Sequence, residues 1–295
     1  MRIVHFSDLH STRLPRDTRA LFDKRALGVL NYLLRRRATF SPRLSAAAVS
    51  VIQGLQPDIL LCTGDLTSVG EPGEFADAAT LIQSMVRATG AEFWAVPGNH
   101  DRYVRDERCR QACRETFREL NAFLPLEDMP AELSRRGLRL LFLDEAIPTA
   151  AHKSCGRIGE LASAWLDERT RPPRHTNERR ILVGHFPSAR ANGRPLARRR
   201  ALHGGEQVAR LLEEGRLDVS LCGHIHTPFR RDFDSGAMEV CAGALPLAGL
   251  LNVIDYSPDS GLLTQHWEQV GGVSGCRVGL ASRMVAAEPV PQGGA

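Results

Sequence analysis

The chain has 295 residues, a formal net charge of +4 and basic side chains that are almost all arginine. This length is enough to bury a sizeable core, in one large domain or two small ones. No apolar run reaches the roughly 18 residues of a membrane-spanning helix, and the first residues enter a strand-like segment instead of a signal sequence, so we expect a cytoplasmic protein. Its 7 cysteines include no CxxC pair, which argues against a disulfide framework or a zinc finger and favours buried thiols.

Short apolar runs alternate along the chain with amphipathic stretches. The apolar runs predict buried strands at 2–6, 58–62, 92–96, 138–143, 180–184, 218–222, 238–242, 251–256 and 262–267. The amphipathic stretches predict helices at 42–56, 74–89, 104–121, 158–170 and 204–214. This alternation is typical of an α/β protein, and we favour a single domain over residues 1–270. Residues 271–295, rich in glycine, alanine, valine and proline, are expected to form a flexible tail.

Polar clusters occur at one recurring place in this alternation, directly after a strand. The segments SDLH, TGD, GNHD, GH and GHIH each follow one of the apolar runs. In open α/β sheets ligands bind beyond the carboxyl ends of the strands, so these segments can converge on one crevice although they are far apart in the sequence. The candidate site residues that they supply are Asp8, His10, Asp65, Asn99, His100, Asp101, His185, His224 and His226.

Imidazole nitrogen mixed with carboxylate and amide oxygen is a ligand set that suits manganese, iron, zinc or a similar divalent ion. In an extended segment, residues two apart point the same way, so Asp8 and His10 can direct both side chains at one site. The same holds for His224 and His226. Asp65 has two carboxylate oxygens and can bridge two cations. The sequence therefore predicts a centre that holds two divalent metal ions.

The ordered series Asp-x-His, Gly-Asp, Gly-Asn-His-Asp, Gly-His and Gly-His-x-His resembles the calcineurin-like metallophosphoesterase superfamily over residues 1 to about 268. The resemblance implies an α/β fold of two packed mixed β-sheets flanked by helices, a four-layer αββα sandwich with two metal ions between the sheet ends. It implies that the first metal ion is held by Asp8, His10, Asp65 and His226. It implies that the second is held by Asp65, Asn99, His185 and His224.

The resemblance also implies a hydrolase that cleaves a phosphodiester or pyrophosphate bond by attack of a metal-bridging hydroxide. His100 is then expected to stay off the metal ions and to stabilise or protonate the leaving oxygen. We expect Asp101 to orient that imidazole, and the alternative is that Asp101 caps the turn. The alternative of another class is a non-catalytic metal-binding scaffold, which loss of ligands would mark; no ligand is missing here.

Two loops carry features that the metal chemistry does not require. A cap insertion at about 13–41 contains a helical pattern with Leu27, Leu30, Leu33 and Leu34 on one face, and the segment after His185 is rich in arginine. An apolar face beside arginines fits a lipidic, anionic substrate and peripheral contact with an anionic membrane surface. The alternative is a cap helix that packs on the domain. The candidate substrate-binding arginines are Arg35, Arg36, Arg37, Arg194 and Arg198.

The substrate stays open among phosphorylated small molecules and lipid-linked compounds. The cap insertion resembles that of the UDP-diacylglucosamine pyrophosphatases within the superfamily, which implies a lipid-linked nucleotide as substrate. The cyclic-nucleotide phosphodiesterases share the same metal motif and are the alternative. A nucleic-acid substrate is not favoured, because the sequence has no aromatic-interleaved basic groove.

Overall fold

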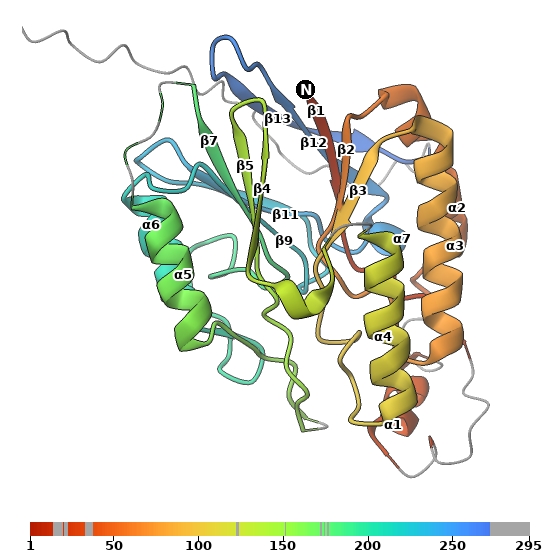
Figure 1. Ribbon diagram of the computed structural model, residues 1–295. Helices are drawn as coiled ribbons and strands as arrows, with labels where there is room; N and C mark the ends of the chain where they lie inside the picture. The colour runs from red at the N-terminus through yellow and green to blue at the C-terminus, as the bar shows by residue number, and fades with distance from the viewer. Residues whose placement is uncertain are drawn as a thin grey trace, which may run out of the picture.

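Two β-sheets lie face to face, and helices cover the outer face of each sheet (Figure 1). This four-layer αββα arrangement confirms the fold expected from the sequence. The computed structural model describes residues 1–13, 20, 23–32, 38–121, 124–150, 152–171, 173, 175 and 177–271. Within these residues, no helix combines the length and the apolar character needed to cross a membrane.

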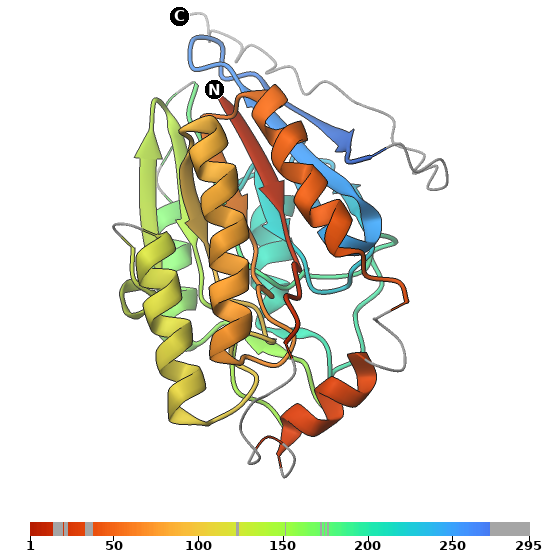
Figure 2. The same cartoon turned by 90° about the vertical axis from the view of Figure 1, so that its right-hand side faces the viewer.

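The first sheet has the N-terminal strand at its centre, with a parallel neighbour on one side and an antiparallel neighbour on the other. In spatial order its strands are β13 (Leu263–Gln269), β12 (Leu250–Tyr256), β1 (Arg2–Phe6), β2 (Ile59–Cys62) and β3 (Glu92–Ala95). The helices on its outer face are α2 (Pro42–Leu55), α3 (Pro72–Thr89) and α4 (Glu107–Leu120). Figure 2 looks onto these helices and shows β1 running down from the N-terminus between them.

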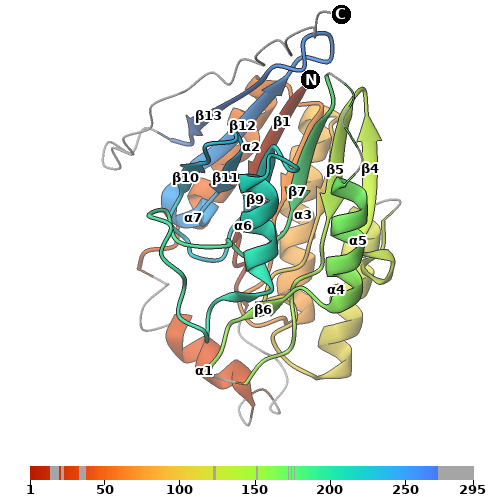
Figure 3. The same cartoon turned by 90° about the vertical axis from the view of Figure 1, so that its left-hand side faces the viewer.

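The second sheet is parallel in its middle and closed by antiparallel strands at both edges. In spatial order its strands are β10 (Phe229–Asp232), β11 (Met238–Cys241), β9 (Val219–Cys222), β7 (Arg179–Val183), β5 (Leu138–Phe142) and β4 (Ala131–Arg135). The helices α5 (Glu160–Thr170) and α6 (Gly205–Glu213) cover its outer face (Figure 3). The remaining short elements are β6 (Gly156–Arg157), β8 (Leu202–His203), a 3₁₀ turn (Leu126–Asp128) and α7 (Leu245–Ala248).

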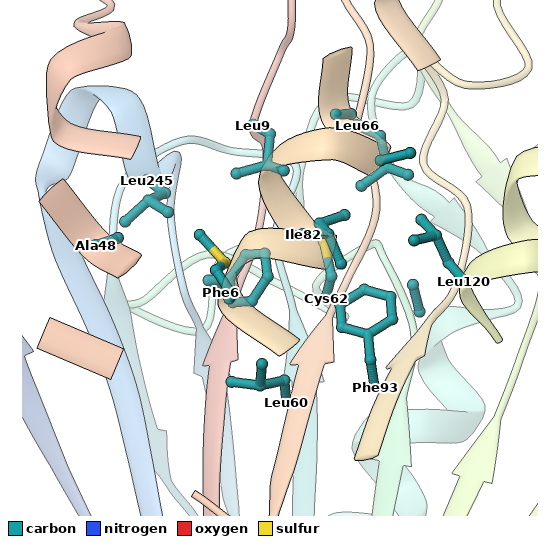
Figure 4. Close-up of a cluster of buried hydrophobic side chains, with 14 of the residues drawn as sticks. Phe6, Leu9, Ala48, Leu60, Cys62, Leu66, Ile82, Phe93, Leu120 and Leu245 are labelled. Carbon is teal, nitrogen blue, oxygen red and sulfur yellow. The ribbon is translucent and has the colours of Figure 1, made fainter. Parts of the chain in front are cut away.

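Alternation along the strands sends neighbouring side chains into two different cores. In β1, Ile3 packs between the two sheets, whereas Val4 and Phe6 pack against the helices. Figure 4 shows Phe6 in this outer core with Leu60 of β2 and Ile82 of α3. A fully buried side chain of this size stabilises the fold by about 1.5–3 kcal/mol relative to an exposed one. The two cores therefore fix the ends of β1 and β2, from which the polar loops leave.

The strands and helices that the hydrophobic pattern predicts are present, with ends shifted by a few residues. The pattern misses β4 and β10, whose sequences AELSR and FRRD are polar. Both strands lie at the edges of the second sheet, where side chains need not be apolar because much of the strand faces water. The six cysteines in the described part of the chain are free and buried, as expected. Residues 272–295 of the expected tail lie outside the described residues.

Helix α1 (Lys24–Asn31) belongs to the cap insertion and lies beyond the end at which β1 finishes (Figure 2). Its anchor is Arg25, whose buried guanidinium contacts Asp23 at 2.7 Å and Glu71 at 2.6 Å. Leu27 and Leu30 are 55% and 51% exposed, so the helix is attached by its charged side and not through these leucines. The other leucines and arginines singled out in this insertion, Leu33, Leu34, Arg35, Arg36 and Arg37, lie outside the described residues.

Candidate metal centre

The loops that follow β1, β2, β3, β7 and β9 meet at one end of the sandwich, because these strands run parallel within each sheet. Backbone hydrogen bonds join neighbouring loops: Asp8 N donates to Gly64 O over 2.9 Å, and Gly223 N donates to His185 O over 2.8 Å. Another bond joins the two sheets, since the backbone amide of His224 donates to Oδ2 of Asp8 over 3.0 Å. Residues that are far apart in the sequence are therefore held in one region.

Four side chains form a compact cluster of ligand atoms. One atom from each of Asp8, His10, Asp65 and His226 lies within 4.8 Å of all the others. Nε2 of His226 is 3.3 Å from Oδ1 of Asp8 and 2.9 Å from Nε2 of His10. These four residues are the set that the sequence resemblance implies for the first metal ion.

Asp65 connects this cluster to a second group of side chains. Its Oδ2 lies 3.7 Å from Nε2 of His10 and 3.6 Å from Nε2 of His185. In the second group, Nδ1 of His224 lies 2.8 Å from Oδ1 of Asn99. The carboxylate of Asp65 therefore stands between two imidazoles that are expected to bind different metal ions, which is the position of a bridging ligand.

Backbone carbonyl groups orient the buried imidazoles. Nδ1 of His10 lies 3.2 Å from the carbonyl oxygen of Thr67, and Nδ1 of His185 lies 2.5 Å from that of Thr63. A carbonyl oxygen can only accept, so Nδ1 carries the proton in each ring and the lone pair of Nε2 points into the cluster. Such outer hydrogen bonds are typical of histidines that bind metal ions.

His224 lies between two acceptors. Its Nε2 is 3.1 Å from the carbonyl oxygen of Arg200, while Nδ1 faces Oδ1 of Asn99. Burial lowers the pKa of His224 well below its usual value, so the ring is neutral and has one N–H to donate. With a single N–H, the ring can donate to Oδ1 of Asn99 or to the carbonyl oxygen of Arg200, but not to both. The other ring nitrogen then faces an oxygen with its lone pair, unless the amide of Asn99 is reversed. A cation between Nδ1 and Oδ1 would satisfy both atoms.

The burial of the ligand atoms tests whether metal ions fit this site. Oδ1 of Asp8 and Nε2 of His185 are buried and have no hydrogen-bond partner among the described residues. Burial raises the pKa of Asp8, but the imidazoles of His10 and His226 beside its carboxylate outweigh this effect and hold the pKa well below its usual value. An ionised carboxylate oxygen and an imidazole lone pair are costly to bury without a partner. Divalent cations fit both atoms.

The backbone of the candidate ligands adopts an uncommon conformation. Residues with a Cβ atom seldom take a positive φ, because the Cβ atom crowds the backbone. Those that do so at this site are Asp8 (54°), His10 (47°), Asp65 (52°), His224 (68°) and His226 (60°). Asp8 and His10 therefore do not converge from an extended segment, and neither do His224 and His226, so the extended conformation expected for both pairs from their spacing is wrong. Backbone strain of this kind persists where the surroundings fix it, and it is concentrated at functional sites.

His100 and Asp101 take different positions beside the cluster. Nδ1 of His100 contacts the carbonyl oxygen of Ser68, and its ring stacks on Tyr103 with centroids 5.0 Å apart and an interplanar angle of 11°. The carboxylate of Asp101 accepts hydrogen bonds from the backbone amides of Thr67 at 3.0 Å and Gly98 at 2.9 Å. The expectation that Asp101 orients the imidazole is therefore wrong; Asp101 caps the turn, and Ser68 contacts the ring.

The two candidate arginines that the structure describes are not members of the ligand cluster. Arg194 and Arg198 are exposed in the segment after β7, and Arg35, Arg36 and Arg37 lie outside the described residues. Sequence reasoning missed Glu145, which is buried and accepts hydrogen bonds of 2.8 Å from the backbone amides of His185 and Phe186. Burial raises the pKa of Glu145 to about 8. Its position directly after the predicted strand 138–143 follows the same rule as the other polar clusters and could have identified it.

A family model described as calcineurin-like phosphoesterase matches residues 1–228. The cAMP/cGMP dual specificity phosphodiesterase of Mycobacterium tuberculosis is 31% identical over 179 residues, which cover 59% of this chain and 50% of that protein. The probable glycerophosphodiester phosphodiesterase of Arcobacter nitrofigilis is 27% identical over 175 residues, which cover 58% of this chain and 57% of that protein. The chain thus spans only 50% to 57% of the length of these two relatives.

Solved structures agree with the family model at the level of the fold. A dimetal phosphatase from Danio rerio superimposes with a TM-score of 0.62 and 14% sequence identity, over 92% of this chain and 96% of that one. The match to the family model includes all five polar clusters. The solved structure shares the sandwich that positions them. The chain therefore belongs to the calcineurin-like phosphoesterase family.

Proposed function

We propose that this chain is a metal-dependent hydrolase that cleaves a phosphodiester bond in a small molecule, with a cyclic nucleotide as the first candidate substrate. The observation that carries the proposal is the position of Asp65, whose Oδ2 lies 3.7 Å from Nε2 of His10 and 3.6 Å from Nε2 of His185. This geometry suits a bridging ligand between two cations. The relatives described above support the reaction class, because their names include phosphodiesterases for cyclic nucleotides and for glycerophosphodiesters.

In this proposal, the first metal ion is held by Asp8, His10, Asp65 and His226. The second is held by Asp65, Asn99, His185 and His224. Two divalent cations supply charge neutralisation for the phosphoryl group and make water more acidic. The identity of the metal is proposed as manganese, iron or zinc, since nitrogen and oxygen ligands are mixed and thiolates are absent from the set.

His100 is the residue that we assign to the leaving group. Nδ1 donates to the carbonyl oxygen of Ser68, and we assign to Nε2 the proton that is delivered to the leaving oxygen of the substrate. The backbone amide of His100 also donates to Oδ1 of Asp65 over 2.7 Å, which fixes the imidazole relative to the bridging carboxylate. Asp101 acts as a positioning residue, since its carboxylate holds the turn that carries Asn99 and His100.

A cavity beside the first ligand set supports a substrate with a flat organic group. It has a volume of about 240 Å³, and its lining includes His10, Tyr32, Phe40 and Leu81. The rings of His10 and Phe40 lie 5.5 Å apart in an edge-to-face arrangement. Aromatic and apolar walls favour stacking of a planar ring such as a nucleobase. A cyclic nucleotide could thus place its phosphate at the metal centre and its base in this cavity.

The test is an assay of manganese-loaded protein against bis-p-nitrophenyl phosphate, cyclic AMP, a glycerophosphodiester and UDP-diacylglucosamine. We expect turnover of bis-p-nitrophenyl phosphate and cyclic AMP, which should disappear with a chelator and return with added metal. Stoichiometric binding of two metal ions without turnover of any of the four compounds would instead support the non-catalytic scaffold and overturn the proposal.

A lipid-linked substrate is the second candidate, and the exposed leucines of α1 are the observation that favours it. Leu27 and Leu30 are 55% and 51% exposed, so they are available for the surface of a bilayer or for an acyl chain. Under this candidate, Leu27→Ser with Leu30→Ser should weaken binding to vesicles of anionic lipid. Leu161→Ser is the matched control, because Leu161 is 88% exposed on α5. Absence of vesicle binding by the parent protein at low salt would reject a membrane-resident substrate.

A further inference from the structure

A second and larger cavity lies outside the metal centre, between the loop at 147–157 and the segment at 198–203. Its volume is about 830 Å³, which is in the range of roughly 300–1,000 Å³ typical of small-molecule sites. Basic side chains contribute most of the polar lining. We call the cavity with these side chains the basic pocket: Lys153, Arg157, Arg198, Arg199, His152 and His203.

Among the described residues, no acidic side chain neutralises the positive charge of the basic pocket. None of the described residues that line it is acidic. In the described part of the chain, no carboxylate lies within ion-pair distance of Lys153, Arg157, Arg198 or Arg199, in contrast to the buried Arg25, which lies within this distance of three carboxylates. Four cations around one hollow produce a positive potential that attracts anions from solution.

The two walls of the basic pocket are joined by backbone hydrogen bonds. Strand β6 pairs with β8 in parallel, and this pairing places Arg157 opposite His203. Ser154 N donates to Arg199 O over 2.9 Å, and Gly156 N donates to Ala201 O over 3.2 Å. The arginines of one wall are therefore held in register with the basic residues of the other, so their charges converge without further folding.

The basic pocket adjoins the metal centre on both sides. On one wall, the carbonyl oxygen of Arg200, the residue after Arg199, lies 3.1 Å from Nε2 of His224. On the other wall, the carbonyl oxygen of Lys153 lies 3.4 Å from Nζ of Lys24. The ammonium of Lys24 lies 4.2 Å from the ring centroid of Tyr103, which stacks on His100. Figure 3 shows β6 and α1 at the same end of the sandwich, where these loops gather.

We propose that the basic pocket binds a second phosphate group of the substrate while the scissile phosphodiester lies at the metal centre. The proposal rests on the proposed function and adds to it a preference, within the same substrate class, for small molecules that carry a phosphate in addition to the bond that is cleaved. Arginine suits this role, because its guanidinium can donate two parallel hydrogen bonds to phosphate oxygens. A substrate without the second phosphate would be cleaved without using the pocket.

The experiment compares two esters that differ by one phosphate, thymidine 5′-(p-nitrophenyl phosphate) and the same ester with a 3′-phosphate. Both release p-nitrophenol, so the chemical step is matched. We expect the parent protein to favour the 3′-phosphorylated ester by about tenfold or more in kcat/KM, mainly through a lower KM. In the double variant Arg198→Ser with Arg199→Ser, the ratio of kcat/KM for the 3′-phosphorylated ester to that for the plain ester should fall toward one. Added salt should lower the same ratio in the parent protein. Arg87→Ser with Arg118→Ser is the control, because it removes the same charge from exposed positions of α3 and α4.

The outcomes separate this inference from the proposed function. If neither ester nor bis-p-nitrophenyl phosphate is cleaved, the proposed function fails, and calorimetry with thymidine 3′,5′-bisphosphate then tests the pocket by binding alone. Tighter binding of the bisphosphate than of thymidine 5′-phosphate, lost in the double variant, would support the second phosphate site. Equal ratios in the parent, the double variant and the control would overturn it. The proposal would also be overturned if the double variant bound a short single-stranded oligonucleotide more weakly than the parent but kept the parent's preference for the 3′-phosphorylated ester.

Discussion

Gly98 lies so close to Asp65 that a Cβ atom on Gly98 would overlap both Oδ1 and the backbone nitrogen of that aspartate. The same atom would lie 2.7 Å from Cε1 of His185. Gly98→Ala should therefore displace the bridging carboxylate and reduce metal content, although the substitution adds a single methyl group. Metal analysis of the purified variant measures this effect.

Gly54→Ala is the control for that substitution. Gly54 lies inside α2, and a Cβ atom there would meet nothing within 4 Å. Alanine is favoured over glycine by about 0.5–1 kcal/mol in a helix interior and by less in the last turn, where Gly54 lies, so this variant should lose no stability and should retain its metal ions. A Gly98→Ala protein with normal metal content would show that the turn can move without disturbing Asp65.

Asp65→Asn should remove both metal ions, because the same side chain is placed to serve both sites and a neutral amide is a poor bridge between two cations. Elemental analysis after metal loading should give much less than two ions per chain. Asp234→Asn, a change at an exposed position of the β10–β11 turn, is the control and should bind as the parent does. Retention of two ions by Asp65→Asn would reject the bridging assignment.

His100→Ala should retain the metal ions and lower kcat, since an acid that protonates the leaving group contributes about 10²–10⁴-fold to the rate. The loss should be smaller for an ester of p-nitrophenol, which leaves readily without protonation, than for cyclic AMP. Steady-state kinetics on the two substrates measures the difference. Equal losses would assign His100 to charge stabilisation instead of proton transfer.

Tyr103→Leu tests how the imidazole of His100 is positioned. The stacked ring would be lost, while the contact between Nδ1 and the carbonyl oxygen of Ser68 would remain. We expect a reduced kcat with little change in KM and full metal content, and Tyr103→Phe should restore most of the rate because it restores the ring. If Phe and Leu behave alike, stacking has no part in positioning His100.

Glu74 should make the stability of the protein depend on pH. Burial raises the pKa of Glu74 from 4.5 to about 7, although the backbone amides of Val69 and Glu71 donate to its carboxylate. Between these two pH values the folded state binds more protons than the unfolded state, so stability falls as the pH rises. The decrease due to this one group is about 3–4 kcal/mol at most, since one pKa unit corresponds to about 1.4 kcal/mol.

The measurement is the free energy of unfolding of the parent protein and of Glu74→Gln from pH 4.5 to pH 8. The parent should lose stability relative to the variant up to about pH 7 and remain at a constant difference above it. A constant difference over the whole range would mean that Glu74 titrates normally in the folded protein.

The sequence located most of the candidate site because the rule that it used is geometric. Polar residues at the ends of parallel strands must converge, and this places Asp8, Asp65 and His185 together whatever the details of the loops. The rule concerns side chains only and does not predict contacts made by main-chain atoms. The carbonyl oxygens of Thr63 and Thr67, which orient two imidazoles, belong to residues whose side chains give no such signal.

Two further features depend on the direction in which a side chain points, which the sequence does not contain. Asp101 follows His100 directly, yet the turn that begins at Gly98 points its carboxylate back to backbone amides. In α1, the helical pattern correctly groups Leu27 with Leu30 but does not say which side faces the protein. The buried ion pairs of Arg25 decide that question, and they depend on Glu71, a residue of another element.

Each sheet carries only part of the ligand set, so the position of one part relative to the other depends on the apolar layer that packs between the sheets. Leu61 and Val183 belong to that layer, and neither has any contact with solvent. The hydrogen bond from the backbone amide of His224 to Asp8 joins the two ligand groups at the edge of this layer. A smaller side chain in this layer would change the separation of the two ligand groups. The rate of catalysis would then respond to a substitution at a residue that does not touch the substrate.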